Sequence, residues 1–199
     1  MHIKRFLFTA LALFPLVGLA SCEKDSFTDS RDGQTYRTVQ IGNQTWMAEN
    51  LNYHTEGSSC YGDKPANCQK YGRHYTWDAA LDACPSGWHL PSIAEFDTLI
   101  ATVGGEYVAG KVLKSKSGWK SDGNGTDDYG FSALPAGFHV IDNGYFGDAG
   151  DYANFWSATE YNSGYAYCMS MDYFSDYAYP SYLDKPLGLS VRCLRDSRL

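Results

Sequence analysis

The chain of 199 residues carries 16 Lys and Arg against 23 Asp and Glu, which gives a formal charge of −7. Hydrophobic residues make up 44% of the chain and aromatic residues 16%, enough for a packed core, so a wholly disordered chain is excluded. The acidic balance argues against sequence-independent binding of nucleic acid, which requires a basic surface to replace condensed counterions. The length fits one domain and a leader.

The first residues have the pattern of a secretory leader. Lys4 and Arg5 precede an apolar stretch at residues 6–17, and small residues come just before Cys22. This pattern resembles a bacterial lipobox, which implies a signal peptide over residues 1–21 and a lipid on Cys22. The alternative is an ordinary signal peptide cut nearby, with Cys22 in a disulfide. Because no later segment approaches ~18 consecutive apolar residues, we expect membrane attachment through the lipid anchor only.

The segment after the leader predicts a tether. Residues 22–33 are polar and charged, and Phe27 is their only large apolar side chain, so they cannot offset the entropy of becoming ordered. The acids after Cys22 resemble surface-export signals of some bacterial lipoproteins, which implies an outer-membrane surface location in the cell envelope. An ordinary solvated tether explains them equally well. We expect the folded domain to span residues 34–196.

The domain opens with a predicted strand pair. Residues 36–41 and 44–47 are rich in aromatic and β-branched side chains, and a Gly-Asn pair separates them, which indicates a β-hairpin with a tight turn. After a polar stretch at residues 52–72, an aromatic run at residues 73–77 predicts a strand. Residues 77–84 then have a helical composition that stops before a Pro-Ser-Gly sequence.

The clearest helix begins at Ser92. Glu95 follows three residues later in a capping box, and apolar residues recur on one face until a Gly-Gly pair ends the run. Beyond it the chain is rich in Gly, Asp, Asn, Ser and Tyr. Short strands are predicted at residues 132–134, 155–158, 165–171 and 187–194. An early helical half and a later β-rich half predict the α+β class.

Five segments of this chain resemble a known family in the order in which that family carries them. They are VQIGNQTWMAENLN at residues 39–52, CPSGWHLPS at 84–92, GFSALPAG at 130–137, FWSATE at 155–160 and SVRCL at 190–194. Together they resemble the Fibrobacter succinogenes major paralogous domain, which is typical of secreted bacterial lipoproteins. The biochemical role of that family is largely undefined, so the resemblance implies a family more readily than a function.

The resemblance also implies a fold. The segment GWHLPSIAEF at residues 87–96 is similar to a stretch of formylglycine-generating enzymes, whose fold is a variant of the C-type lectin fold. We therefore expect a C-type-lectin-like domain, with two helices packed beside small antiparallel sheets and long irregular loops. The same segment has a plain structural interpretation, because Pro91 stiffens the entry to the helix, Ser92 caps it, and Trp88 and Phe96 anchor it.

Five cysteines remain if Cys22 carries lipid, and an exported chain keeps disulfides. Cys60 and Cys68 are close in sequence and are predicted to pair. The resemblance to the lectin-like fold implies a second pair, Cys84 with Cys193. Cys168 is then the free thiol. The cysteine spacing and the histidines do not match a zinc site.

A catalytic function is not expected. None of the histidines is near Cys168 in sequence to activate its thiol. Formylglycine-generating enzymes use two cysteines a few residues apart near the C-terminus, whereas Cys168 and Cys193 lie far apart here. This departure argues against that activity.

An oxygen-rich loop at residues 122–128 is a candidate calcium site. Its alternate residues Asp122, Asn124, Thr126 and Asp128 imitate the start of an EF-hand loop, although Asp127 and Ala133 depart from the rest of that pattern. A solvated turn uses the same residue types. The sugar-holding motifs of calcium-dependent C-type lectins are absent, so their binding mode is not transferred.

Tyrosines crowd the end of the chain. Eight tyrosines fall between residues 152 and 182, and tyrosine offers a flat apolar face with a polar tip, suited to a sugar or a protein partner. Alternating Tyr165, Tyr167 and Met169 are better explained as one side of a strand. The tyrosines outside that strand are the predicted ligand-binding residues: Tyr173, Tyr177, Tyr179 and Tyr182.

These features predict an exported, lipid-anchored, non-catalytic module for binding or adhesion, with polysaccharide as the preferred ligand and no cofactor other than calcium at the 122–128 loop. The first alternative is a protein-interaction or structural lipoprotein of the envelope. The second is a modifying enzyme of the formylglycine-generating type. Exposed tyrosines in a groove would favour sugar, a broad flat apolar patch would favour protein, and a cysteine beside a histidine in a deep pocket would favour the enzyme.

Overall fold

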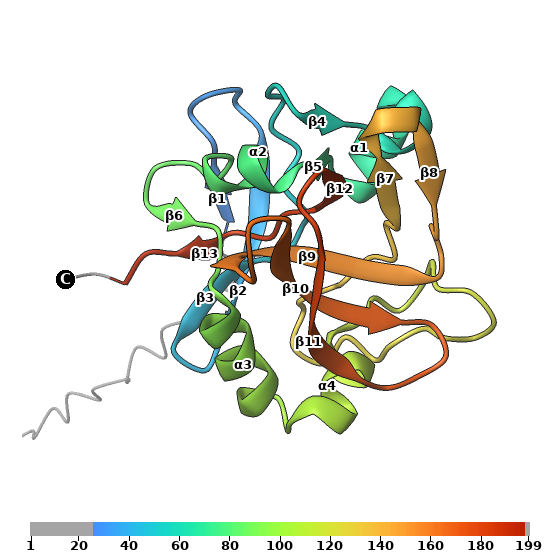
Figure 1. The fold of residues 1–199 in the computed structure, drawn as a ribbon. Helices are drawn as coiled ribbons and strands as arrows, with labels where there is room; N and C mark the ends of the chain where they lie inside the picture. Colours follow the sequence, from blue (N-terminus) through green and yellow to red (C-terminus); the bar gives the residue numbers. More distant parts are fainter. Residues whose placement is uncertain (1–25, 198–199) are drawn as a thin grey trace, which may run out of the picture.

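The computed structural model describes residues 26–197 and contains two sheets with helices packed beside them (Figure 1). The predicted signal peptide and the lipidation at Cys22 lie outside the described residues. The mixture of helices and largely antiparallel strands confirms the α+β class. No helix in residues 26–197 is long and apolar enough to cross a membrane.

The smaller sheet has the strand order β1-β2-β3-β13-β6. Its strands are β1 (Ser26–Thr28), β2 (Thr35–Ile41), β3 (Gln44–Met47), β6 (Trp88–His89) and β13 (Leu194–Arg195). The predicted hairpin is confirmed, because β2 pairs with β3 in antiparallel register from Ile41 opposite Gln44. Gly42 in the turn has a φ of 59°, a conformation that glycine adopts without a steric penalty.

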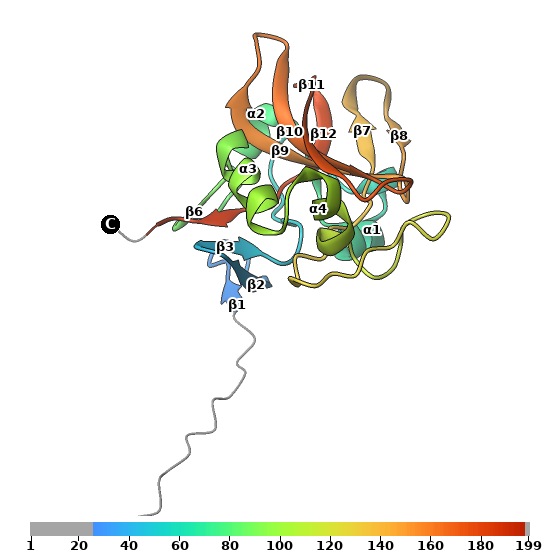
Figure 2. The same cartoon turned by 90° about the horizontal axis from the view of Figure 1, so that it is seen from below.

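The larger sheet has the strand order β11-β10-β9-β12-β5-β4, and a β7–β8 hairpin joins it through β12. The strands are β4 (Ser58–Ser59), β5 (His74–Tyr75), β7 (Phe138–Val140), β8 (Tyr145–Gly147), β9 (Tyr152–Glu160), β10 (Tyr165–Asp172), β11 (Ala178–Asp184) and β12 (Leu187–Ser190). The pairing of β12 with β9 is parallel. Figure 2 shows the β7–β8 hairpin beside strands β9–β12.

The α-helices are α1 (Pro65–Tyr71), α2 (Trp77–Leu81), α3 (Ile93–Thr102) and α4 (Glu106–Leu113). Two short 3₁₀ turns, η1 (Tyr61–Asp63) and η2 (Ile141–Asn143), complete the set. The predicted capping box of α3 is present, since Ser92 Oγ accepts from Glu95 N at 3.3 Å and Ser92 N donates to Glu95 Oε2 at 2.8 Å. Helix α2 begins at Trp77 because the Thr76 hydroxyl caps it, so the strand predicted over residues 73–77 is shortened to β5.

Other local predictions are corrected by tertiary pairing. Residues 132–134 form no strand, and only Ala133 makes an isolated bridge, to Lys114. The run predicted as one strand over residues 187–194 divides into β12 and β13, which belong to different sheets. Strand pairing, rather than composition, decided both cases.

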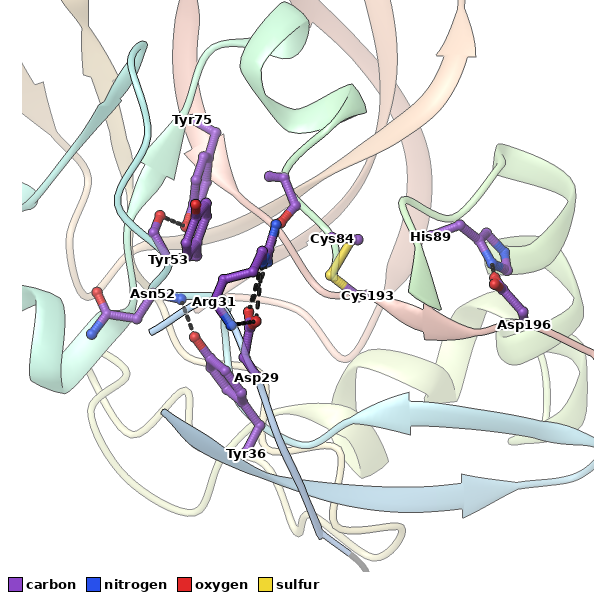
Figure 3. The surroundings of a disulfide bond; sticks show 11 residues. Asp29, Arg31, Tyr36, Asn52, Tyr53, Tyr75, Cys84, His89, Cys193 and Asp196 are labelled. Carbon is purple, nitrogen blue, oxygen red and sulfur yellow. Dashed lines mark hydrogen bonds and ion pairs between the residues drawn. A yellow bond between two sulfur atoms is a disulfide. The ribbon is translucent and has the colours of Figure 1, made fainter. Parts of the chain in front are cut away.

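Part of the predicted tether belongs to the domain. Residues 26–28 form β1 on the edge of the smaller sheet, and Phe27 stacks on Trp88 at 4.4 Å between ring centroids. Asp29 is buried and paired with Arg31 at 2.7 Å, and Arg31 also donates to Ala83 O (Figure 3). Phe27 and the Asp29–Arg31 ion pair therefore attach this stretch to the fold, although its overall composition is polar.

The core consists of two buried clusters on either side of the larger sheet. One joins the sheet to α3 and α4 and includes Phe96, Leu113, Phe155 and Met169. The other packs α2 and the chain termini of the domain against the opposite face, around Trp156. Strands β9 and β10 contribute to both clusters because successive side chains of a strand point to opposite faces.

Two disulfides fasten the fold. Cys84 pairs with Cys193 (Figure 3), and Cys60 pairs with Cys68, so both predicted disulfides are present. The second disulfide ties the segment after α2 to the residue just before β13. Within residues 26–197, Cys168 is a buried free thiol.

Arg192 is the largest charged side chain in the core and is fully buried. Its guanidinium donates to Asn50 Oδ1 from two nitrogens, at 3.2 and 2.6 Å, and to a set of backbone carbonyls that comprises Met47 O, Phe131 O and Ser132 O. Burial lowers the pKa of Arg192 to about 9. Since these five bonds match the five N–H groups of a guanidinium, the side chain serves as a structural junction between the two sheets and the 131–132 loop.

Candidate functional site

The structure does not bring the four predicted ligand-binding tyrosines together. Tyr177 packs edge-on against Tyr107 of α4, with 5.1 Å between ring centroids. Tyr173 is partly buried against the core. Tyr179 and Tyr182 lie three residues apart on β11, so their side chains point to opposite faces of the sheet. Tyr179 lines a pocket beside strands β9–β11, whereas Tyr173 lines a separate pocket near α4.

That pocket has a volume of about 250 Å³ and lies between the β9–β11 strands and the β7–β8 hairpin. Its walls carry aromatic and apolar side chains: Phe138, Tyr152, Tyr179, Leu183 and Leu187. Its polar groups are Asp148, Asn154, Ser170 and Ser181. A concave apolar site with a few polar groups is the usual form of a small-molecule binding site.

Strand register places these side chains on one face. Ser170 of β10 lies opposite both Asn154 of β9 and Tyr179 of β11, and Ser181 lies opposite Cys168. Because side chains alternate along each strand, Tyr152 shares the face of Asn154. The pocket thus collects side chains from three neighbouring strands and closes against the hairpin.

A short chain of contacts fixes the floor. Ser170 Oγ donates to Asn154 Oδ1 at 2.7 Å, and Cys168 Sγ lies 3.6 Å from Ser170 Oγ. Asn154 is 7% exposed and Ser170 is 4% exposed. Within residues 26–197, the Asn154 Nδ2 group has no hydrogen-bond partner, so this amide retains a free donor at the pocket.

Acidic groups dominate the electrostatics of the pocket. Asp148 is exposed and is the only charged residue among those described that line the pocket. Burial raises the pKa of Tyr152, and Asp172 and Asp148 raise it further. The pKa of Tyr179 is raised by burial and by Asp172. Both hydroxyls therefore stay protonated at neutral pH and can donate hydrogen bonds.

The residues of the predicted calcium loop lie elsewhere, near α4. Asn124 Oδ1 accepts from Trp119 N at 3.1 Å, and the Thr126 hydroxyl donates to Lys111 O at 3.3 Å. Asp122 and Asn124 line a pocket of about 360 Å³ together with Lys111 and Lys114. Two ammonium groups in the same pocket oppose binding of a divalent cation.

Other polar clusters give no metal or nucleophile site. In the described part of the chain, no group of three or more His, Cys, Asp or Glu side chains is placed to hold a metal ion. Burial raises the pKa of the Cys168 thiol to about 11, which keeps it protonated and weakly nucleophilic. His89 lies 2.6 Å from Asp196 (Figure 3) and 3.0 Å from Glu95, and His139 lies 2.7 Å from Ser59.

A second group of aromatic side chains is exposed on the opposite face of β11. We call Tyr161, Tyr165 and Tyr182 the outer tyrosine cluster; they are 45%, 38% and 49% exposed. The rings of Tyr161 and Tyr182 stack at 4.2 Å, and Tyr165 meets Tyr182 edge-on at 6.0 Å. The rings of this cluster therefore cover one another in part.

Sequence reasoning missed most of the pocket. Ser170 lies inside the strand predicted over residues 165–171, whereas Asn154 lies just before the run predicted over residues 155–158, in the part of β9 that was not predicted. The alternation of both residues with apolar neighbours was the available signal. Phe138 comes from β7, which was not predicted. The contact between these residues depends on strand order and register, which composition does not reveal.

The comparisons with known proteins give a family and no function. The family model of the Fibrobacter succinogenes major domain matches residues 39–195. No curated protein and no solved structure matches the chain. Since the match extends over most of the described domain, the chain belongs to the Fibrobacter succinogenes major domain family.

Proposed function

We propose that this protein is an exported, lipid-anchored, non-catalytic module that binds polysaccharide at the bacterial cell envelope. The observation that carries the proposal is the pocket in which Tyr152, Tyr179 and Phe138 face the polar floor formed by Asn154 and Ser170. Aromatic faces pack against the C–H faces of a sugar, and the amide and hydroxyls bond its oxygens. No reacting group is required for this role.

The finer fold assignment is part of the proposal. A C-type-lectin-like domain is supported by helices packed beside antiparallel sheets and by the disulfide that joins the segment after α2 to the last strands. The lipid anchor is supported by the sequence before Cys22 alone. Such an anchor would hold the domain at a membrane surface, where an extended ligand such as polysaccharide can reach it.

The test is binding of the chain without residues 1–21, with Cys22→Ser, to insoluble cellulose and xylan and to a panel of soluble glycans. We expect saturable binding and at least a tenfold loss of affinity in Tyr179→Ala. Tyr177→Ala is the matched control, because Tyr177 packs on α4 away from the pocket. Absence of binding to every carbohydrate would refute the proposal. Repeating the binding with calcium and with a chelator tests the 122–128 loop.

One observation favours the alternative of a protein partner in the envelope. The outer tyrosine cluster presents exposed aromatic rings that stack on one another, which suits a flat protein surface better than a single sugar. Cross-linking of the anchored protein in its native envelope separates the two readings. Cross-links that depend on Tyr161 and Tyr182, together with no glycan binding, would favour the protein partner.

A further inference from the structure

Resting on the proposed function, the geometry points to a more specific ligand: the pocket is a subsite for one uncharged hexose residue, held by a hydrogen bond from the Asn154 side-chain amide, and it discriminates against acidic sugars. Three features of the pocket carry this inference.

The first is size. Pockets for drug-sized ligands typically measure ~300–1,000 Å³. The pocket here measures about 250 Å³, and aromatic side chains flank it. This volume suits a single sugar ring and leaves the neighbouring residues of a longer chain outside.

The second is an unused donor. Asn154 Oδ1 is occupied by the Ser170 hydroxyl, which fixes the orientation of the amide. Its Nδ2 group lacks a protein partner among the residues described, and although the residue is 7% exposed, this atom is not among the buried unsatisfied groups and so stays accessible. A ligand that supplies a neutral oxygen can therefore accept a hydrogen bond from it. Hydroxyl and ring oxygens of a hexose are such acceptors.

The third is charge. The exposed Asp148 lines the pocket, and the buried Asp172 follows Ser170 by two residues on the same face of β10. Among the described lining residues there is no Lys or Arg to pair with a carboxylate. A sugar that carries a carboxylate at C6 would therefore meet like charge and leave its own charge unpaired.

Asp148 offers a substitution that changes charge alone. Its φ is 60°, a left-handed conformation that asparagine also tolerates, so Asp148→Asn preserves the backbone and removes the negative charge. Asn154→Ala removes the donor. Tyr182→Ala, on the opposite face of β11, is the matched control for aromatic loss.

The experiment is calorimetric titration of the full mature chain with cellohexaose, mannohexaose and β-1,4-galactohexaose, each also in a form oxidised to carboxylates at C6. We expect a neutral hexaose to bind at least tenfold tighter than its oxidised form. Asn154→Ala should weaken neutral binding at least tenfold, whereas Asp148→Asn should tighten oxidised binding at least threefold and change neutral binding less than twofold. Tyr182→Ala should leave both unchanged. Circular dichroism and thermal melts establish that each variant is folded.

The outcomes separate this inference from the proposed function. If a neutral hexaose binds but its oxidised form binds equally well, or if folded Asn154→Ala binds as the parent does, the subsite is refuted and polysaccharide recognition stands. The same holds if cellulose or xylan binds while no neutral hexaose does. If no carbohydrate binds in any form, both fail.

Discussion

The buried polar clusters around Arg192 and Asn154 differ in whether every hydrogen-bond donor has a protein acceptor. Around Arg192 each guanidinium N–H finds an acceptor, and the cluster adjoins two aromatic rings, Phe131 and Phe155. Around Asn154 one amide group has no partner in the described chain, and the cluster opens into a pocket. Because every donor of the Arg192 guanidinium is paired, the stability of the fold is sufficient to explain that cluster. The Asn154 cluster lies beside a cavity and leaves one donor available to a ligand.

Two tyrosines of β11, Tyr179 and Tyr182, also differ in whether their surroundings leave room for a ligand. Tyr179 lies against polar groups in a pocket, whereas Tyr182 stacks on Tyr161. The residue type is identical and only the face differs. A count of tyrosines therefore does not locate a binding site, while their surroundings do.

The largest expected effect concerns the disulfide next to the Arg192 cluster. Cys84 and Cys193 are 109 residues apart, and closing a loop of that length stabilises the fold by about 5 kcal/mol in the chain-entropy model. Replacing both by serine should lower the free energy of urea unfolding by about this amount. The matched control is the Cys60 and Cys68 pair, separated by 8 residues, for which the loss should be about half. Equal losses would contradict the assignment of the first disulfide to the scaffold.

Next in size is the direct test of the two polar clusters. Arg192→Met leaves three carbonyls and Asn50 without their donor, so we expect a loss of about 3–5 kcal/mol in unfolding free energy. Asn154→Ala removes one hydrogen bond and should cost about 1 kcal/mol. Chemical denaturation of both variants measures the difference. A similar loss of unfolding free energy in the two variants would contradict the proposed difference between the Arg192 and Asn154 clusters.

The pH-dependent effect comes from His74, a buried side chain whose ring nitrogens lack hydrogen bonds in the described chain. Burial lowers its pKa to about 4, and His139 acts in the same direction. The unfolded chain binds this proton below pH 6.5 and the folded chain only below about 4, so stability is complete above 6.5 and falls as the pH drops toward 4. The loss should be on the order of 3 kcal/mol.

Urea unfolding across that pH range, with His74→Phe as the comparison, checks this prediction. In His74→Phe, the free energy of unfolding should no longer fall as the pH drops below 6.5. If it falls as steeply as in the parent, the assignment to His74 is contradicted.

The stability contribution of His89 has the opposite pH dependence. Burial lowers the pKa of His89, but hydrogen bonds with Asp196 and Glu95 outweigh burial and raise it. Its contribution is present below pH 6.5 and is lost as the pH rises through the raised value, and it is small because the pair is partly exposed.

Several elements could be predicted because their signals are local. The β2–β3 hairpin follows from its turn residues, and α3 follows from its cap and its apolar periodicity. Helix α4 escaped prediction because it follows Gly105 with no side-chain cap. Strand β11 contains Pro180, which reads as a strand breaker but is tolerated at the edge of a sheet, where β11 lies.

The family, the α+β class, the leader pattern and the residues that begin and end the clearest elements could all be inferred from the amino-acid sequence. These depend on neighbours within a few positions along the chain. The position of Tyr179 in the pocket beside Asn154, and the Asn154 amide donor that has no protein partner among the described residues, became apparent from the three-dimensional structure. Those facts depend on register among β9, β10 and β11 and on the distant β7–β8 hairpin, and a shift of one residue would turn each side chain to the other face.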